Sequence, residues 1–170
     1  MFKYTICLIK KDNKILLLNR NKKPAMGMWN GVGGKIEDHE TPMQGVIRET
    51  YEETGLKLNS VTYAGNVILK SEVSNAGMYI FIADLPEDLH IETPLNTLEG
   101  TLDWKSIDWI LDKDNMGVIS NLKSYLPVIL EGKLNLEHSF TYDIHNILDY
   151  TTTKVIENEM NKRYKKHQYL

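Results

Sequence analysis

The sequence predicts a domain of the mixed α+β class, in which several strands surround one central helix. Short apolar runs separated by polar turns recur along most of the chain, which is the pattern of β-strands. One segment, residues 42–54, instead repeats its apolar residues at helical spacing and is bracketed by helix-capping residues. The length of 170 residues suits a single domain with a sizeable core.

Composition and charge exclude several classes of protein. Hydrophobic residues make up 42% of the chain and charged residues 25%, so we do not expect intrinsic disorder. A formal net charge of −3 gives no basic field for a nucleic-acid polymer, although a free nucleotide could still bind to local cations. Cys7 is the single cysteine, which excludes an internal disulfide and suits a reducing compartment. We find no signal peptide and no apolar run of transmembrane length, and therefore expect a cytoplasmic protein without membrane contact.

The first part of the chain predicts a β-hairpin and a glycine-rich loop. Residues 3–10 and 14–20 have the composition of strands joined by a turn, and residues 21–27 form a polar loop. Gly31, Gly33 and Gly34 follow, and glycines so closely spaced allow a close backbone approach or a positive φ. Arg20 and Lys35 place two cations beside this loop, either as solvated surface charges or as groups that bind an anion.

Residues 42–54 are the best-defined predicted element. Thr41 is a suitable N-cap, Pro42 suits the first helical position, and Gln44 completes a capping box. Gly55 is suited to end the helix. The apolar face of this helix contains Met43, Val46, Ile47, Thr50 and Thr54.

Three glutamates, Glu49, Glu52 and Glu53, share another face of this helix. Their spacing of three and four residues crowds the carboxylates together, which costs the bare helix roughly 0.2–0.5 kcal/mol per pair. One interpretation is a solvated acidic surface. The other is a site for a cation, and oxygen ligands alone would favour Mg²⁺ or Mn²⁺ over zinc.

The second half of the chain predicts further strands with short helices between them. Residues 61–69 and 77–83 are expected as strands, residues 90–102 as a loop, and 106–111 as the start of a short helix. A helix is predicted over 117–131, with Pro127 causing a kink or a division into two pieces. Residues 134–142 and 146–155 suggest a closing hairpin. The charged tail, 156–170, is expected to pack on the domain or to extend from it as a surface helix.

Residues 34–56 resemble the signature of the Nudix hydrolase family, G-x5-E-x7-R-E-U-x-E-E-x-G-U, where U is apolar. Thr50 stands where an aliphatic residue is usual, and its methyl group can still pack. The resemblance covers residues 3–155 and implies a Nudix hydrolase domain over residues 1–155, folded as an α/β/α sandwich around a mixed sheet. The fixed positions of the signature are occupied by Gly34, Glu40, Arg48, Glu49, Glu52, Glu53, Gly55 and Leu56.

The resemblance also implies roles for particular residues. Mg²⁺ or Mn²⁺ would be held by Glu49, Glu52, Glu53 and the backbone carbonyl of Gly33, while Arg48 would orient a glutamate through an ion pair. The general base could be Glu53 or Glu52, but many family members use a glutamate outside the signature, and Glu99 is our candidate for that role, although it could also be a surface carboxylate of its loop. Substrate contacts are expected from Arg20, Gly34, Lys35 and Asn30, although Asn30 beside a glycine could equally stabilise a turn.

Two kinds of Nudix enzyme are most similar in detail. Residues 29–35 and 146–151 resemble oxidised purine nucleoside triphosphate hydrolases, and residues 21–24 and 99–104 resemble MutT-type 8-oxo-dGTP diphosphatases. This implies a small-molecule nucleotide substrate cut to its monophosphate and pyrophosphate, with 8-oxo-dGTP preferred and oxidised precursors kept from DNA polymerase. One departure is that residues 109–118 lack the adjacent aspartates that read the purine edge. Alternative interpretations are a pterin triphosphate, nucleotide sugar or capped-RNA substrate, or a catalytically silent nucleotide-binding module.

Overall fold

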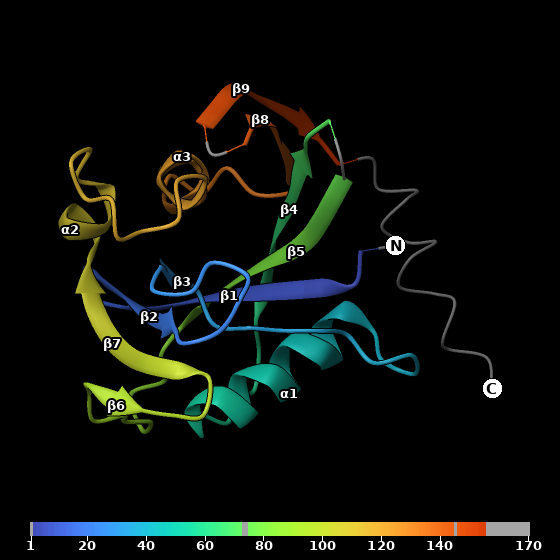
Figure 1. Ribbon diagram of the computed structural model, residues 1–170. Coiled ribbons are helices and arrows are strands. Elements are labelled where there is room, and N and C mark those ends of the chain that lie inside the picture. Colours follow the sequence, from blue (N-terminus) through green and yellow to red (C-terminus); the bar gives the residue numbers. More distant parts are fainter. Residues whose placement is uncertain (1, 73–74, 145, 156–170) are drawn as a thin grey trace.

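A nine-stranded mixed sheet with one long helix on one face and two shorter helices on the other forms the core of the computed structural model (Figure 1). The structure describes residues 2–72, 75–144 and 146–155. The predicted surface helix at 156–170 lies outside these residues. The strands are β1 (Tyr4–Lys11), β2 (Lys14–Arg20), β3 (Trp29–Asn30), β4 (Thr62–Lys70), β5 (Asn75–Asp84), β6 (Leu95–Asn96), β7 (Gly100–Ser106), β8 (Leu136–Asp143) and β9 (Asn146–Lys154). The helices are α1 (Pro42–Thr54), α2 (Ile107–Leu111) and α3 (Leu122–Leu130).

The sheet mixes parallel and antiparallel pairs. Its strand order is β6-β7-β2-β1-β5-β4-β8-β9, with β3 pairing β2 beside this path. The strand pairs β1/β5 and β4/β8 are parallel, and the remaining pairs are antiparallel. The full-length pairing of β2 with β7 brings Arg20 opposite Gly100, so the loops that follow β2 and precede β7 meet at one end of the sheet.

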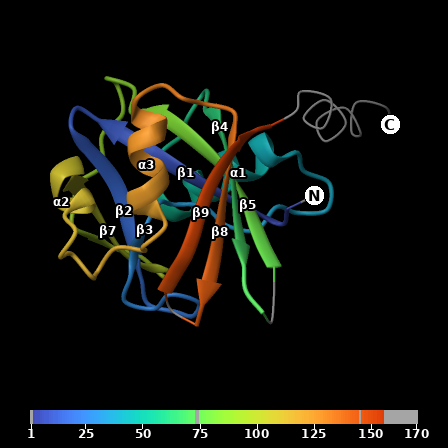
Figure 2. The same ribbon diagram turned by 90° about the horizontal axis from the view of Figure 1, so that it is seen from above.

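Alternating apolar side chains of the strands build two separate cores. Leu16 and Leu18 of β2 join the core beneath α1, which also contains Val46. Ile15 and Leu17 of the same strand join the core beneath α2 and α3. Figure 2, seen from above, shows α3 in front of the strands and α1 behind them. This arrangement confirms the predicted α/β/α sandwich. Among the residues that the structure describes, no helix is long and apolar enough to cross a membrane.

The predicted elements with strong local signals are confirmed. Helix α1 has the predicted bounds, its capping box is formed, and Gly55 ends it in the left-handed conformation. The strands at β1, β2, β4, β5, β8 and β9 are present with ends shifted by at most two residues. One detail of the α1 face was wrong: Met43 is 38% exposed, while Pro42 and Gly45 are buried instead.

The elements that depend on distant partners differ from the prediction. Residues 100–106, expected to begin in a loop, form β7, which pairs along its whole length with β2. The short strands β3 and β6 were likewise expected in loops. Helix α3 begins only at Leu122, because Val118 forms a parallel bridge with Trp29 and leaves the preceding residues outside the helix. Pro127 lies within this one helix.

The glycine-rich segment is inserted beside β1, and this positions the site. Strands β1 and β2 pair only at their hairpin end, from Ile9 to Lys11, and then separate. Residues 31–35 occupy the space, with the N–H of Cys7 donating to the Val32 carbonyl at 2.7 Å and that of Thr5 to the Gly34 carbonyl at 2.9 Å. Gly33 has φ of 141°, and a Cβ there would lie 2.4 Å from the Thr5 carbonyl oxygen, so only glycine fits.

Candidate active site

The acidic face of α1 lies against the inserted glycine segment. Gly34 and Glu49 are close enough that a Cβ on Gly34 would meet the Glu49 carboxylate at 2.3 Å. One helical turn later, Glu53 accepts a hydrogen bond at 2.8 Å from the backbone N–H of Gly33. The carboxylates that were predicted from their helical spacing therefore face a backbone segment that only glycine residues allow to approach so closely.

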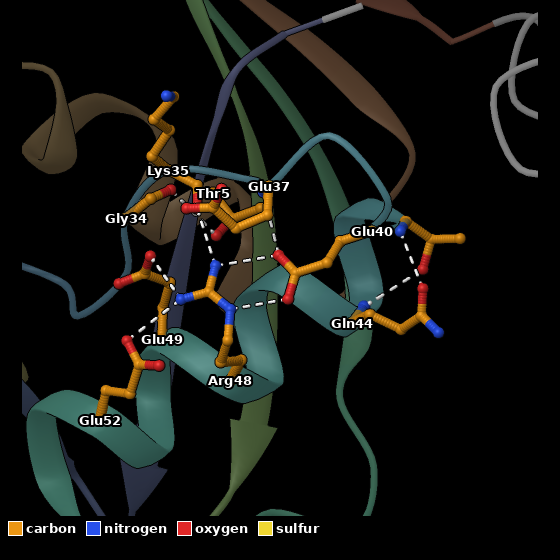
Figure 3. A network of polar contacts seen from close by, with 10 residues as sticks. Thr5, Gly34, Lys35, Glu37, Glu40, Gln44, Arg48, Glu49 and Glu52 are labelled. Atoms are coloured by element: carbon orange, nitrogen blue, oxygen red, sulfur yellow. Dashed lines mark hydrogen bonds and ion pairs between the residues drawn. The ribbon is translucent and has the colours of Figure 1, made fainter.

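Arg48 is the centre of a polar network (Figure 3). Its Nε and Nη2 donate to the two Glu40 carboxylate oxygens at 2.6 and 2.9 Å, a two-point contact with a buried carboxylate. Its Nη1 donates to Glu49 at 2.9 Å and to Glu52 at 3.1 Å. Nη2 also donates to the backbone carbonyl of Lys35 at 2.9 Å. Arg48 thus ties α1 to the loop before it and holds two of the acidic side chains in place.

The electrostatics of this network follow from these contacts. The hydrogen bond from Arg48 holds the pKa of Glu40 below its ordinary value, despite the burial of the carboxyl group. The same contact with Glu40 raises the pKa of the Arg48 guanidinium, with a further contribution from Glu49. Glu40 also accepts the N–H of Glu37 at 3.0 Å. Glu40 therefore braces the loop against the helix, and Arg48 stays charged beside Glu49 and Glu52.

The pKa of Glu53 is raised to about 7, mainly because the carboxyl group is buried and in smaller part by the charges of Glu49 and Glu99. The Gly33 N–H and the charge of Arg20 act in the opposite direction. Burial likewise raises the pKa of Glu49, against the opposing influence of Arg48. The pKa of Glu53 responds to the charges of both Glu99 and Arg20, so these three predicted site residues lie in one region. That region is at the end of β2 and the start of β7.

The donor set suits a hard divalent cation, although the carboxylates are not gathered into a metal centre as they stand. Within residues 2–72, 75–144 and 146–155, no group of three His, Cys, Asp or Glu side chains could hold a metal ion in the present arrangement. Each glutamate has an N–H partner instead: Arg48 for Glu49 and Glu52, and Gly33 for Glu53. Crowded carboxylates that raise one another's pKa are stabilised by an added cation, so these residues fit Mg²⁺ or Mn²⁺.

The predicted substrate-binding residues are placed less uniformly. Arg20 lies at the end of β2, where its Nε donates to the Pro24 carbonyl at 3.1 Å. The side chain of Lys35 points away from the Arg48 network (Figure 3). The Asn30 side-chain oxygen accepts the backbone N–H of Gly31 at 2.9 Å, so in this structure the residue stabilises its own turn. Gly33, whose carbonyl is the predicted metal ligand, donates its backbone N–H to Glu53 at 2.8 Å.

Two further contacts of lysine residues were not found from the sequence. Lys22, in the polar loop after β2, forms an ion pair of 2.7 Å with Glu99. Lys105 of β7 lies 4.4 Å from the ring centroid of Trp29 and 5.1 Å from that of Trp109, while it also pairs with Asp103 at 2.7 Å. Both depend on the pairing of β2 with β7, which has no local signal in the sequence.

Comparisons with known proteins agree with this architecture. A family profile described as NUDIX domain matches residues 3–120. The oxidized purine nucleoside triphosphate hydrolase of Mus musculus is 29% identical over 155 residues, which cover 89% of this chain and 94% of the mouse protein. The uncharacterized Nudix hydrolase YvcI of Bacillus subtilis is 32% identical over 143 residues, covering 81% and 85% of the two chains. The crystal structure of a MutT protein from Bacillus halodurans superposes with a TM-score of 0.72 at 26% identity, covering 89% of this chain and 97% of that one.

Proposed function

Because the chain belongs to the Nudix hydrolase family, we propose that it hydrolyses nucleoside triphosphates to the monophosphate and pyrophosphate, with oxidised purine nucleotides such as 8-oxo-dGTP as preferred substrates. It is a Nudix hydrolase that acts on nucleotide substrates. The choice of oxidised purines is supported by the mouse relative, which is named oxidized purine nucleoside triphosphate hydrolase and aligns over nearly the full length of both chains. Removal of damaged precursors before DNA synthesis would be the cellular role.

One observation carries the proposal to the level of residues. Glu53, on α1, accepts a hydrogen bond from the glycine segment, and its pKa is shifted by the charges of Arg20 and Glu99. Arg20 and Glu99 come from two other segments of the chain, the end of β2 and the residue before β7, which the pairing of these strands brings together. Acidic groups for a cation and a basic group for a phosphate chain therefore occupy one region. A surface acidic patch would not require this convergence of three separate segments.

We assign roles to the residues accordingly. Glu49, Glu52, Glu53 and the Gly33 carbonyl would hold the cation. Nudix hydrolases generally use divalent ions such as Mg²⁺, which neutralise phosphate charge and make water more acidic. Arg48 positions Glu49 and Glu52 through its hydrogen bonds. In hydrolysis, water attacks phosphorus, the P–O bond to pyrophosphate breaks, and the water proton passes to a carboxylate oxygen of Glu53, Glu52 or Glu99.

Substrate contacts would come from the glycine side of the site. Arg20 can bind phosphate oxygens in two-point geometry once its bond to Pro24 is exchanged, and the backbone of Gly34 lies beside Glu49. Lys35 would have to turn towards the carboxylates from its present outward direction (Figure 3). Asn30 would contact the base only after giving up its bond to the Gly31 N–H.

Product analysis on a nucleotide panel tests this proposal. With Mg²⁺, we expect 8-oxo-dGTP to yield its monophosphate and pyrophosphate with a higher kcat/KM than dGTP, dATP, a nucleotide sugar or a pterin triphosphate. Glu53→Gln should abolish turnover. Glu131→Gln should not, because Glu131 is an exposed carboxylate that pairs with Lys133 outside the site. Equal turnover of all triphosphates would contradict the base preference but support the site. Turnover by Glu53→Gln near the wild-type rate would contradict the metal assignment.

A further inference from the structure

An ion pair joins the two loops that meet beside the candidate site. Lys22 Nζ lies 2.7 Å from Glu99 Oε1, and the side chains are 57% and 38% exposed. The same loops are joined by Asn21, whose backbone N–H donates to the Glu99 carbonyl at 3.0 Å and whose side chain donates to the Leu98 carbonyl at 3.1 Å. The backbones are therefore held together by Asn21, and the ion pair is an addition that can break without separating the loops.

The backbone of Glu99, directly before β7, is held in place by hydrogen bonds. Its N–H donates to the Thr97 hydroxyl at 3.2 Å, and Thr97 is bonded in turn to the Gly100 carbonyl. Gly100 has φ of 150°, and a Cβ there would overlap the Asn19 carbonyl oxygen, so the turn is fixed against β2. Because the backbone is held in place, a change of side-chain rotamer is sufficient to move the Glu99 carboxylate from Lys22 to another positive group.

Lys22 also lies close to where the phosphate chain is proposed to bind. It follows Arg20, the residue paired with Gly100, by two positions along the chain. The charges of both Arg20 and Glu99 reach Glu53. Lys22, through its pair with Glu99, therefore lies at the same end of the sheet as Arg20, and its ammonium group is compact, flexible and suited to a phosphate oxygen.

We propose that Lys22 exchanges partners during substrate binding: it neutralises Glu99 in the free protein and binds a phosphate oxygen of the substrate once Glu99 turns to the divalent cation. This inference rests on the proposed function. Lys22 is thereby a substrate-binding residue outside the family signature, and Glu99 is kept from repelling Glu53 until the cation arrives. An exposed ion pair is weak, so the exchange meets little resistance.

The first test measures metal binding without substrate. Binding of Mn²⁺, followed by electron paramagnetic resonance, is compared for wild type, Lys22→Met and Lys133→Met, whose partner Glu131 is also 2.7 Å away but lies outside the site. Lys22→Met should tighten Mn²⁺ binding by roughly two- to fivefold because Glu99 loses its competitor. In a Glu99→Gln background the same substitution should have no effect. A gain that persists in that background, or no gain at all, overturns the exchange.

The second test measures the phosphate contact. For Lys22→Met, we expect the KM for the best triphosphate to rise by roughly five- to tenfold while kcat stays within about twofold, because a contact to bound substrate is lost. Lys22→Arg should restore most of the KM. An unchanged KM, or a fall in kcat alone, overturns the contact. If wild type and Lys133→Met turn over no nucleotide, the proposed function fails, while the Mn²⁺ measurement still decides whether Lys22 and the cation compete for Glu99.

Discussion

Among single residues, Arg48 has the most demanding position, because three carboxylates and a backbone carbonyl share one guanidinium group. Its shortest contact is with Glu40, which is buried, whereas Glu52 is more than half exposed. Charged hydrogen bonds that are shielded from water contribute more than exposed ones. The Glu40 contact therefore stabilises the fold, and the contacts with Glu49 and Glu52 order the site.

Glu40→Gln should lower the free energy of unfolding by about 1–3 kcal/mol at pH 7, because Arg48 loses a charged partner. The sign of the pH effect follows from the lowered pKa of Glu40. Its stabilisation is fully present above the unfolded-state pKa of about 4.3 and is lost as pH falls through the folded-state pKa. Urea unfolding at pH 7 and pH 3.5 should therefore show a smaller difference between the two proteins in acid.

Glu131→Gln provides the matched control, since this carboxylate is also paired with a cation but is 60% exposed. It should change stability by less than about 1 kcal/mol at either pH. A difference between wild type and Glu40→Gln that is the same at both pH values would show that packing, not charge, makes the Glu40 contact important.

The site residues and the ion pair of Arg48 with a glutamate could be predicted from the sequence, but a pairing between residues far apart in the chain could not. The signature places Glu40, Arg48 and the three glutamates at fixed spacing, and α1 brings them to the glycine segment as expected. The pairing of Lys22 with Glu99 joins residues 77 positions apart. No local pattern distinguishes Lys22 from Lys23 beside it, so only the structure separates them.

At the level of elements, the inserted segment 31–35 is the feature that turns a helix with an acidic face into a candidate site. It fills the gap left where β1 and β2 separate, and it presents the Gly33 N–H to Glu53. The segment has no side chain at the points of closest approach, so the backbone of β1 and the carboxylates of α1 can both contact it.

Gly33→Ala should destabilise the protein by about 1–3 kcal/mol or more, because the added Cβ would lie 2.4 Å from the Thr5 carbonyl oxygen at a φ of 141°. Gly117→Ala is the control: its Cβ would have its nearest neighbour at 3.4 Å, so the effect should be small. Urea unfolding of both variants gives the comparison. Equal stability of Gly33→Ala and Gly117→Ala would mean that the segment can move away from β1 at little cost.

Elements were predictable where their signals are local. The capping residues fixed both ends of α1, and the apolar runs of β1, β2, β4 and β5 were sufficient for strands. Strand β7 was missed although Thr101, Asp103 and Lys105 alternate with apolar residues, which is the period of a half-buried strand. Its pairing with β2, 80 to 92 positions earlier, has no local signal. The start of α3 depended in the same way on the distant contact of Val118 with Trp29.

For the whole molecule, a net charge of −3 conceals a strongly uneven distribution. Four carboxylates, Glu49, Glu52, Glu53 and Glu99, are brought to one region, and the pKa values of Glu49 and Glu53 are raised by burial and by neighbouring negative charge. Folding must overcome this repulsion, because the unfolded chain keeps these groups hydrated and apart. An ion that binds only the folded arrangement will therefore stabilise the entire domain.

Millimolar Mg²⁺ should consequently raise the melting temperature, compared with NaCl of equal ionic strength. If Mg²⁺ is present at about ten times its Kd, the gain is roughly 1.4 kcal/mol, which corresponds to about 3–6 °C for a chain of this size. The double variant Glu49→Gln/Glu53→Gln should lose this response, because it lacks two of the proposed ligands, even if its own melting temperature is higher after the repulsion is removed. Retention of the full Mg²⁺ response by the double variant would place the cation elsewhere on the molecule and would contradict the metal assignment.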